Sequence, residues 1–175
     1  MPLCSLAGSN IILRGLDGAS LRHTAHTLYS NESHLLETLP TVDLLIGAVL
    51  LPGARAPKLI RRDMLRRMRP GSVLVDIAID QGGCAETSRA TTHHDPVFVE
   101  EGVTHYCVAN MPGAYARTAT QALTNVTYRY LETLADYGVE ETCQKNPALI
   151  GGINIRDGKV TCKAVADAHG MKMTN

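Results

Sequence analysis

The stretch that most constrains the fold is an apolar run over residues 73–79, with turn signals on both sides. Pro70-Gly71 precedes the run, and Asp76 is its one residue that is not apolar. Apolar and polar side chains do not alternate, which is typical of a strand buried on both faces in the centre of a parallel sheet. The sequence therefore predicts an α/β protein with this strand near the middle of its sheet.

The predicted strand ends on a carboxylate, Asp80, which Gln81, Gly82 and Gly83 follow. In open α/β sheets ligands bind just beyond the carboxyl ends of the strands. Asp80 and the glycine backbone are therefore the first candidates for a functional site. The alternative is that Asp80 only caps the turn that follows it, and the pattern leaves both interpretations open.

Two further apolar runs, over residues 42–48 and 104–109, are also typical of buried strands. A helical period over residues 57–69 separates the first of them from the central strand, which indicates a βαβ unit. We expect the three runs to be parallel neighbours with a right-handed crossover. Asp80 and Asn110 should then lie at the same edge of the sheet.

Other features complete the predicted organisation. Gly47 interrupts the first run, and a glycine inside a strand suggests that another group packs close to the backbone there. The further expected elements are a strand at 10–14 with a turn at 15–18, a helix at 31–39, a long helix at 118–138, a hairpin about Asp157-Gly158 and a short helix closed by Gly170. Strand–helix alternation gives way to helix near residue 115, so we divide the chain into 1–115 and 116–175.

Composition excludes several classes of protein. The 175 residues are 45% hydrophobic and 19% charged, as in an ordinary soluble globular protein. Positive and negative charges balance at 17 each, so no global field favours nucleic acid or a membrane surface. No apolar run approaches the roughly 18 residues of a membrane span. The five cysteines form no Cys-x-x-Cys, which predicts reduced thiols, with Cys107 in the core, and a cytoplasmic location.

Two kinds of site are not supported by the motifs. His93-His94-Asp95 invites a metal interpretation, but adjacent histidines on a loop rarely both reach one ion, and no spaced third ligand follows. The chain also contains no Gly-x-Gly-x-x-Gly and no Gly-x-x-x-x-Gly-Lys. The common phosphate-binding glycine turns are therefore missing from this sequence.

Three segments together resemble L-alanine dehydrogenase: residues 47–59, 75–84 (V-D-I-A-I-D-Q-G-G-C) and 108–112 (V-A-N-M-P). They are similar to the second half of its NAD domain and to its carboxy-terminal segment, over about residues 30–170. The related transhydrogenase α-subunit shares the pattern, but it carries Glu in place of Asp80 and Asn in place of Cys84. Both residues favour alanine dehydrogenase.

The resemblance implies a fold and its division along the chain. Residues 1–115 are expected to form a partial Rossmann-like parallel sheet, the second half of an NAD-binding domain. Residues 116–175 are expected to form a mainly helical carboxy-terminal segment of the substrate domain. A homo-oligomer is expected for three reasons: the family forms hexamers, a sheet that lacks the family's first strand and Gly-rich turn exposes an edge, and the long helix has an apolar stripe.

The resemblance also implies an activity, the reversible NAD-dependent conversion of L-alanine to pyruvate and ammonia. Asp80 matches the catalytic aspartate, whose carboxylate can orient the attacking water and stabilise the cationic imine. Some family members carry a metal pair on the long helix where this chain has Thr133 and Tyr137, so no metal is expected. The implied NAD contacts are Ser30, Val49, Leu50, Ile77, Ala78, Ile79, Asp80, Arg89, Val108, Ala109, Asn110 and Met111.

The sequence departs from the family in what precedes these segments. The family begins with a substrate domain and a Gly-rich turn that receives the pyrophosphate, and this sequence has no counterpart of either. We therefore expect an incomplete site that is inactive alone, completed by an amino-terminal half. Arg14 stands where the ribose-binding acidic residue belongs, which would suit a 2′-phosphate, but the residues around it match the family poorly. NAD is the expected cofactor, and NADP remains an alternative to it.

Two alternatives remain at this point. One is a non-catalytic module that keeps the half-sheet and helices for nucleotide binding or oligomerisation. The other is an NAD domain of the transhydrogenase α-subunit type. The first differs from the main hypothesis in activity and not in ancestry, whereas Asp80 and Cys84 argue against the second.

Overall fold

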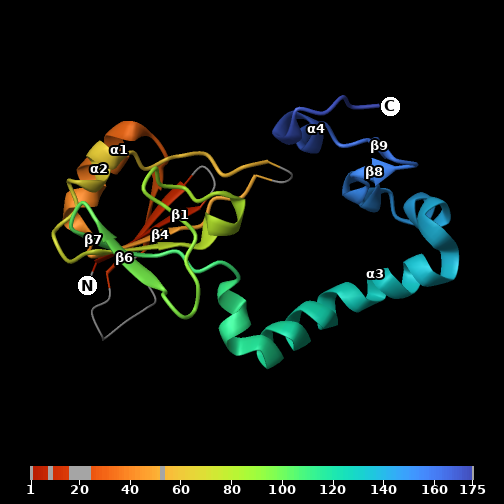
Figure 1. Ribbon diagram of the computed structural model, residues 1–175, viewed down its shortest axis with the longest axis horizontal. Helices are drawn as coiled ribbons and strands as arrows, with labels where there is room; N and C mark the ends of the chain where they lie inside the picture. Colours follow the sequence, from red (N-terminus) through yellow and green to blue (C-terminus); the bar gives the residue numbers. More distant parts are fainter. Residues whose placement is uncertain (1, 8–9, 16–24, 52–53, 175) are drawn as a thin grey trace. The chain divides into compact units, whose positions relative to one another are not determined.

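The computed structural model describes residues 2–7, 10–15, 25–51 and 54–174. The chain divides into two units, of which the first comprises Met1–Leu51 and Arg55–Met111 and the second comprises Pro52–Ala54 and Pro112–Asn175. The first unit carries the main sheet and the second carries the long helix (Figure 1). The turn predicted at residues 15–18 lies largely outside the described residues.

The first unit is built on a seven-stranded sheet among the described residues, in the order β3-β2-β1-β4-β5-β7-β6. The three predicted runs correspond to β4, β5 and β7, and both β4–β5 and β5–β7 pair in parallel. This confirms the predicted neighbours and the α/β class. Since β2 and β6 run against their neighbours, the sheet is mixed. The strands are β1 (Pro2–Ala7), β2 (Asn10–Gly15), β3 (Ala25–Tyr29), β4 (Leu44–Gly47), β5 (Val73–Asp76), β6 (Val97–Glu100) and β7 (Val103–Tyr106).

One expectation about this sheet was wrong. The central strand ends at Asp76, and the 3₁₀ turn η2 (Ile77–Gln81) follows it, because the Asp76 side chain accepts a hydrogen bond from the Ala78 backbone and turns the chain. On the other side of β4 the sheet continues, because β1 pairs with β4 in parallel, and β3 and β6 are the edge strands of the described sheet. The strand predicted at 10–14 is confirmed as β2, whereas β1 and β3 were not predicted.

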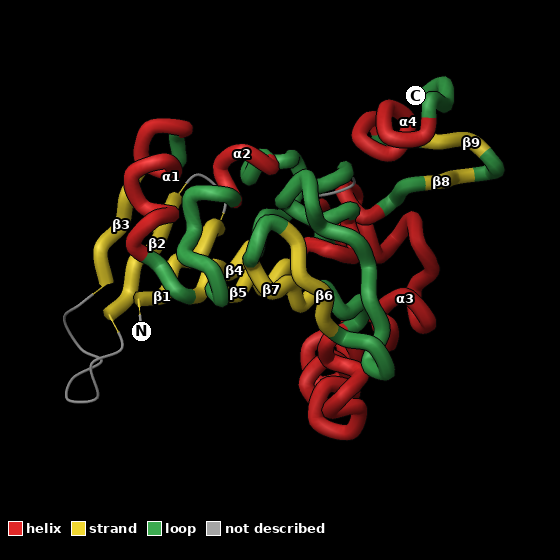
Figure 2. The backbone as a smooth tube through the Cα atoms, turned by 60° about the vertical axis from the view of Figure 1, so that its left-hand side comes forward, coloured by secondary structure: helices red, strands yellow, loops and turns green. Residues whose placement is uncertain are grey.

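One face of the sheet is covered by the helices α1 (Glu32–Thr38) and α2 (Arg62–Leu65), as Figure 2 shows. Leu45 of β4 and Leu74 of β5 are fully buried on this side, whereas Leu44 and Val73, which point to the other face, are only partly buried. The expected burial on both faces is therefore complete for one face only. The core is formed by Leu35, Leu39, Val42, Leu45, Ile60, Met64, Leu65, Met68, Leu74, Ala85 and Val103.

The two helices differ in how well they match the sequence pattern. For α1 the prediction is confirmed: Asn31 caps it by accepting a hydrogen bond from His34 N at 2.8 Å, and η1 (Leu39–Thr41) follows at Pro40. The helix expected over 57–69 is reduced to α2. Its first turn does not form because the N–H groups of Leu59 and Ile60 donate to Cys84 O, at 2.8 Å and 3.1 Å.

The second unit is mainly helical. Its long helix α3 (Ala116–Lys145) is interrupted at Gly138, whose φ of 69° is left-handed, so the predicted stop at that glycine is confirmed as a break within a longer helix. The predicted hairpin is also confirmed, as β8 (Ile155–Arg156) and β9 (Lys159–Val160), as is the short helix α4 (Lys163–His169) capped by Gly170. The 3₁₀ turns η3 (Met111–Tyr115) and η4 (Pro147–Gly152) flank α3. None of the helices within the described ranges is both long enough and apolar enough to cross a bilayer.

An ion-pair network ties α2 to the turn between β6 and β7. Glu101 in that turn accepts hydrogen bonds from Arg62 and from Arg66, each at 2.7 Å. The hydrogen bonds from Arg66 and Arg62 lower the pKa of the Glu101 carboxyl from 4.5 to about 2. Arg62 and Arg66 therefore tie the outer face of α2 to this turn.

We predict that Glu101→Gln lowers stability in a pH-dependent way. Because the pKa of Glu101 is lower in the folded state, its contribution is present above pH 4.5 and is lost as the pH falls through about 2. The difference in thermal unfolding midpoint between wild type and variant should be full at pH 7 and shrink toward pH 2, as measured by circular dichroism. Glu132→Gln on α3 serves as the control, and a difference that does not change with pH would contradict the prediction.

Candidate functional site

The candidate site is built where parallel strands end at one edge of the sheet. Asp80 follows β5, Asn110 follows β7, and Asn110 N donates to Asp80 Oδ1 at 3.3 Å. Asn110 has a φ of 55°, a left-handed conformation that asparagine tolerates better than most residues. The prediction that these two residues meet at the same edge is confirmed. Asp80 and Asn110 are both exposed, so the pair is open to a ligand.

Two exposed apolar side chains follow the strands that end at this edge. Ile77 directly follows β5 and is 53% exposed, and Leu50 follows the neighbouring strand β4 and is 65% exposed. Exposed large apolar residues next to a polar group are typical of a binding surface. This edge therefore combines an apolar wall with a carboxylate and a backbone amide.

Other predicted cofactor residues are buried, and their side chains cannot reach a ligand. Val49 and Ala78 pack with Ala56 and Cys84 in a small cluster, and Ile79 and Val108 are also buried. These residues can offer only backbone groups to a cofactor. Ala109 is exposed and Met111 partly exposed, next to Asn110.

Ser30 is separated from the Asp80 group along the sheet, and Arg89 rests on a side chain of β6. Ser30 follows β3, which runs in the same direction as β5, so Ser30 lies at the same edge. Four strand spacings separate β3 from β5 in the sheet order, or roughly 19 Å at about 4.8 Å per strand. Arg89 lies over the ring of Phe98 on β6, with 3.9 Å between its Cζ and the ring centroid.

Asp76 is important for the turn that carries Asp80, and the sequence pattern did not identify it. Its side chain is fully buried and accepts hydrogen bonds from Ala78 N at 3.1 Å, Cys84 N at 2.8 Å and Ser88 Oγ at 2.6 Å. The sequence did carry a signal, because Asp76 is the one ionisable residue in an apolar run and a buried carboxylate needs donors. The Asp76 carboxylate thus fixes the turn that carries Asp80.

The backbone around Asp76 has no room for a side chain at two glycines. A Cβ on Gly47 would overlap Sγ of Cys84, which confirms the predicted close approach. Gly83 has a φ of 78°, and its Cβ would lie 2.8 Å from Asp76 Oδ2. Burial and the nearby Asp76 carboxylate raise the pKa of the Cys84 thiol, so Cys84 is a packing residue and not a nucleophile. Cys107 is buried, as predicted.

Lys58, in the segment that follows β4, donates hydrogen bonds to the same turn. Its Nζ donates to Gly82 O at 2.6 Å and to Ala85 O at 3.0 Å. Ala56 N also donates to Gln81 O at 2.9 Å. The segments after β4 and β5, which carry Leu50 and Asp80, are therefore held to each other by direct hydrogen bonds.

The residues present fit one side of a dinucleotide cofactor. Leu50 and Ile77 offer exposed apolar side chains after β4 and β5, and Asp80 offers an exposed carboxylate at the same edge. The described residues contain no group of three or more His, Cys, Asp or Glu side chains able to hold a metal ion. His93 Nε2 lies 3.3 Å from Asn110 O, so this histidine contacts the edge itself.

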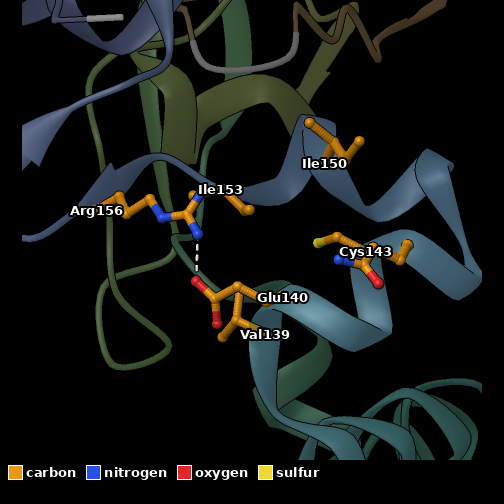
Figure 3. A pocket seen from close by; sticks show the side chains of 7 residues that line it. Val139, Glu140, Cys143, Ile150, Ile153 and Arg156 are labelled. Carbon is orange, nitrogen blue, oxygen red and sulfur yellow. Dashed lines mark hydrogen bonds and ion pairs between the residues drawn. The ribbon is translucent and has the colours of Figure 1, made fainter.

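A separate pocket of about 270 Å³ lies within the second unit (Figure 3). Glu140 of α3 and Arg156 of β8 form an ion pair beside it, so neither offers a free charge to a ligand. No residue of this pocket was predicted as a site residue. It is lined by Val139, Glu140, Cys143, Gln144, Ile150, Ile153 and Arg156.

Comparison with known proteins identifies what the chain is similar to. The family described as alanine dehydrogenase/PNT, C-terminal domain, matches residues 12–163. The alanine dehydrogenase of Halomonas elongata is 57% identical over 146 residues, which are 83% of this chain and 39% of that protein. That of Geobacillus stearothermophilus is 54% identical over 164 residues, which are 93% of this chain and 44% of that protein. The chain thus spans about two fifths of the length of these relatives.

Among solved structures, an alanine dehydrogenase is more similar to this chain than a transhydrogenase is. An L-alanine dehydrogenase structure superposes with a TM-score of 0.67 at 45% identity, covering 82% of this chain and 39% of that one. The transhydrogenase of Sinorhizobium meliloti superposes with a TM-score of 0.53 at 32% identity, covering 60% of this chain and 30% of that one. The likeness to transhydrogenase is therefore the weaker of the two.

We predict that Gly47→Ala destabilises the protein by about 1–3 kcal/mol, the usual cost of overpacking a core. The added methyl group would meet the Cys84 sulfur, so Cys84→Ala should restore part of the loss. Urea unfolding of both single variants and of the double variant measures this, with Gly151→Ala as a control because its Cβ would meet open space. The proposed clash would be contradicted if the double variant lost more unfolding free energy than the two single variants lose together.

We also predict that the two carboxylates of this turn differ in how much they contribute to stability. Asp76→Asn places an amide against three donors in a buried site and should cost roughly 1–3 kcal/mol. Asp80→Asn changes an exposed group and should stay within about 0.5 kcal/mol of wild type. Urea unfolding of the two variants tests the contrast, and equal losses would refute it.

Proposed function

The chain belongs to the alanine dehydrogenase/PNT family, and from this we propose that it forms the nicotinamide side of the NAD site of an L-alanine dehydrogenase. The observation that carries the proposal is the contact between Asn110 N and Asp80 Oδ1, beside the exposed side chains of Ile77 and Leu50. A carboxylate next to an apolar wall at the carboxyl edge of parallel strands is suited to a nicotinamide ring and to a developing positive charge.

In this proposal Asp80 is the catalytic residue. NAD held at this edge would supply the acceptor for the hydride from Cα of L-alanine. The Asp80 carboxylate stabilises the iminium cation left on the substrate and orients the water that attacks it, after which ammonia leaves and pyruvate forms. Asn110 N holds one oxygen of that carboxylate, so the other oxygen is free to contact water.

We further propose how the cofactor lies along the edge. Ser30 stands on the adenosine side, and Asp80 and its neighbours stand on the nicotinamide side. The roughly 19 Å between β3 and β5 suits a dinucleotide that crosses the ends of the strands. The remaining contacts proposed are backbone groups of Val49, Ala78, Ile79 and Val108, with Ala109 and Met111 beside Asn110.

The two parts of the chain take different roles in the proposal. Residues 1–115 form part of an NAD-binding domain, and residues 116–175 form a carboxy-terminal segment of the substrate domain. An amino-terminal half, on the same or another chain, supplies the groups that bind the substrate carboxylate and the acid–base histidine. The exposed Leu123, Val126 and Leu131 of α3 support association into a cytoplasmic homo-oligomer.

A non-catalytic nucleotide-binding or oligomerisation module is the second candidate. A module of this kind would use the same edge to bind a dinucleotide without turnover. A transhydrogenase-type domain is less well supported, at 32% identity and 60% coverage of this chain.

The test combines binding with turnover. We expect the purified chain to bind NADH, seen as enhanced NADH fluorescence, and to show no L-alanine-dependent NADH formation at 340 nm alone. Adding the amino-terminal remainder of the Halomonas elongata enzyme as a separate polypeptide should restore turnover, and Asp80→Asn should abolish it while leaving NADH binding within about threefold, because the carboxylate acts in the chemical step.

Other outcomes decide between the candidates. Turnover by the chain alone that disappears in Asp80→Asn would show that the site is complete without a further half. NADH binding that no amino-terminal half converts into turnover would favour the non-catalytic module. Absence of saturable NADH binding by the wild-type chain would contradict the main proposal and a nucleotide-binding module, and would favour an oligomerisation module.

A further inference from the structure

A histidine from the loop before β6 contacts the candidate site. His93 Nε2 lies 3.3 Å from Asn110 O, and Asn110 N in turn donates to Asp80. A carbonyl oxygen only accepts hydrogen bonds, so this contact requires a proton on Nε2. The imidazole is therefore the donor, as the neutral tautomer protonated at Nε2 or as the imidazolium.

The loop that carries His93 is held in shape by its other residues. Thr91 Oγ1 donates to Pro96 O at 3.0 Å and closes the base of the loop. Asp95 N donates to Thr92 Oγ1 at 3.4 Å within it. Neither bond involves the His93 side chain, so the loop presents the imidazole and does not depend on it.

The backbone brings His93 and Asn110 together in register. Thr91 and Val108 form a parallel bridge, and Ala109 N donates to Thr91 O at 3.2 Å. Two residues after this bridge, one segment reaches His93 and the other reaches Asn110. The contact between these two residues therefore continues a backbone pairing that is already in place.

Asn110 is held at both of its peptide groups. Its N donates to Asp80 Oδ1 at 3.3 Å, and its O accepts from His93. The φ of 55° at Asn110 is left-handed, and a residue other than glycine keeps such a conformation where its surroundings hold it. Release of the carbonyl would let Asn110 return to a common backbone conformation, and this rotation would carry its N–H away from Asp80.

We propose that His93 is a positioning residue, which donates to the Asn110 carbonyl and thereby keeps Asn110 N on the Asp80 carboxylate. This inference rests on the proposed function of Asp80 and adds a residue on which the alignment of its carboxylate depends. In the conversion of L-alanine that carboxylate acts on the iminium cation and the attacking water, so a misaligned Asp80 slows the chemical step. The alternative is that the turn at Asn110 is stable by itself and that His93 only covers it.

The first measurement is an NMR spectrum and needs no ligand. An amide proton that donates to a carboxylate resonates downfield, so Asp80→Ala should move the Asn110 amide proton upfield. His93→Leu should move it in the same direction. His93→Gln should keep the wild-type position, because the glutamine amide nitrogen stands as many bonds from the backbone as Nε2 and can donate to the same carbonyl.

The comparison between these two variants isolates the hydrogen bond. Neither leucine nor glutamine has an aromatic ring, so a difference between their spectra does not arise from the lost ring current of His93. An Asn110 amide proton with the same shift in His93→Leu and His93→Gln would overturn the inference.

The second measurement is turnover after the amino-terminal remainder of the Halomonas elongata enzyme has been added as a separate polypeptide. His93→Leu should lower kcat for L-alanine roughly fivefold, as expected for the loss of one hydrogen bond. The KM for L-alanine should stay within about threefold of wild type, because the Asp80 carboxylate acts on a charge that develops in the transition state. His93→Gln should restore kcat, which a role in packing alone would not predict.

His94→Leu is the matched control, since His94 is the next residue of the same loop and is also exposed. It should change neither the Asn110 amide proton nor kcat. Thermal unfolding midpoints verify that each variant is folded at the assay temperature.

The outcomes separate this inference from the proposed function. Wild-type kcat in His93→Leu, or a loss that His93→Gln does not restore, would overturn the inference, while turnover by the wild-type chain with the added half upholds the proposed function. Absence of turnover by the wild-type chain with the added half would remove both.

Discussion

The buried carboxylate of Asp76 is the interaction on which the candidate site depends. A fully buried carboxylate is costly unless donors surround it. Its three donors come from three places along the chain, and each bond fixes a different part of the edge. The bond from Ala78 N ends β5 and starts η2, the bond from Cys84 N closes the glycine turn, and the bond from Ser88 Oγ holds the segment that leads to Arg89. The glycines follow from the same constraint, because Gly47 and Gly83 leave the space that the carboxylate and the Cys84 sulfur occupy.

Asp76 and Asp80 are two carboxylates with opposite environments on one short turn. Asp76 points into the unit and its oxygens are occupied by donors from the same chain, so it is available for structure only. Asp80 is exposed, and within the described part of the chain its one hydrogen-bond donor is Asn110 N, so an oxygen remains for a ligand. The division is set by the backbone, because the 3₁₀ turn between them rotates the second carboxylate outward. A longer strand would have placed both side chains on the same face.

The sequence predicted the features that depend on local pattern. The three apolar runs, their parallel pairing and the meeting of Asp80 with Asn110 followed from strand patterns and the general rule for carboxyl edges. The features it did not predict depend on contacts distant in sequence. The helical period at 57–69 was overridden because Cys84 O captures the N–H groups of Leu59 and Ile60. Likewise β1 and β3 are strands by pairing and not by pattern.

The origin of these contacts bears on what the chain can do by itself. The bonds that fix the turn of Asp80, from Lys58, Ala56, Asn110 and the donors of Asp76, all arise within the first unit. A turn that is held by its own unit needs no ligand or further domain to take its shape, and a preformed surface loses less entropy when it binds. The proposed cofactor wall is therefore assembled before any partner arrives. What a partner has to add is the opposite wall, where the substrate would be bound, because reaction between cofactor and substrate requires both to be held in near contact.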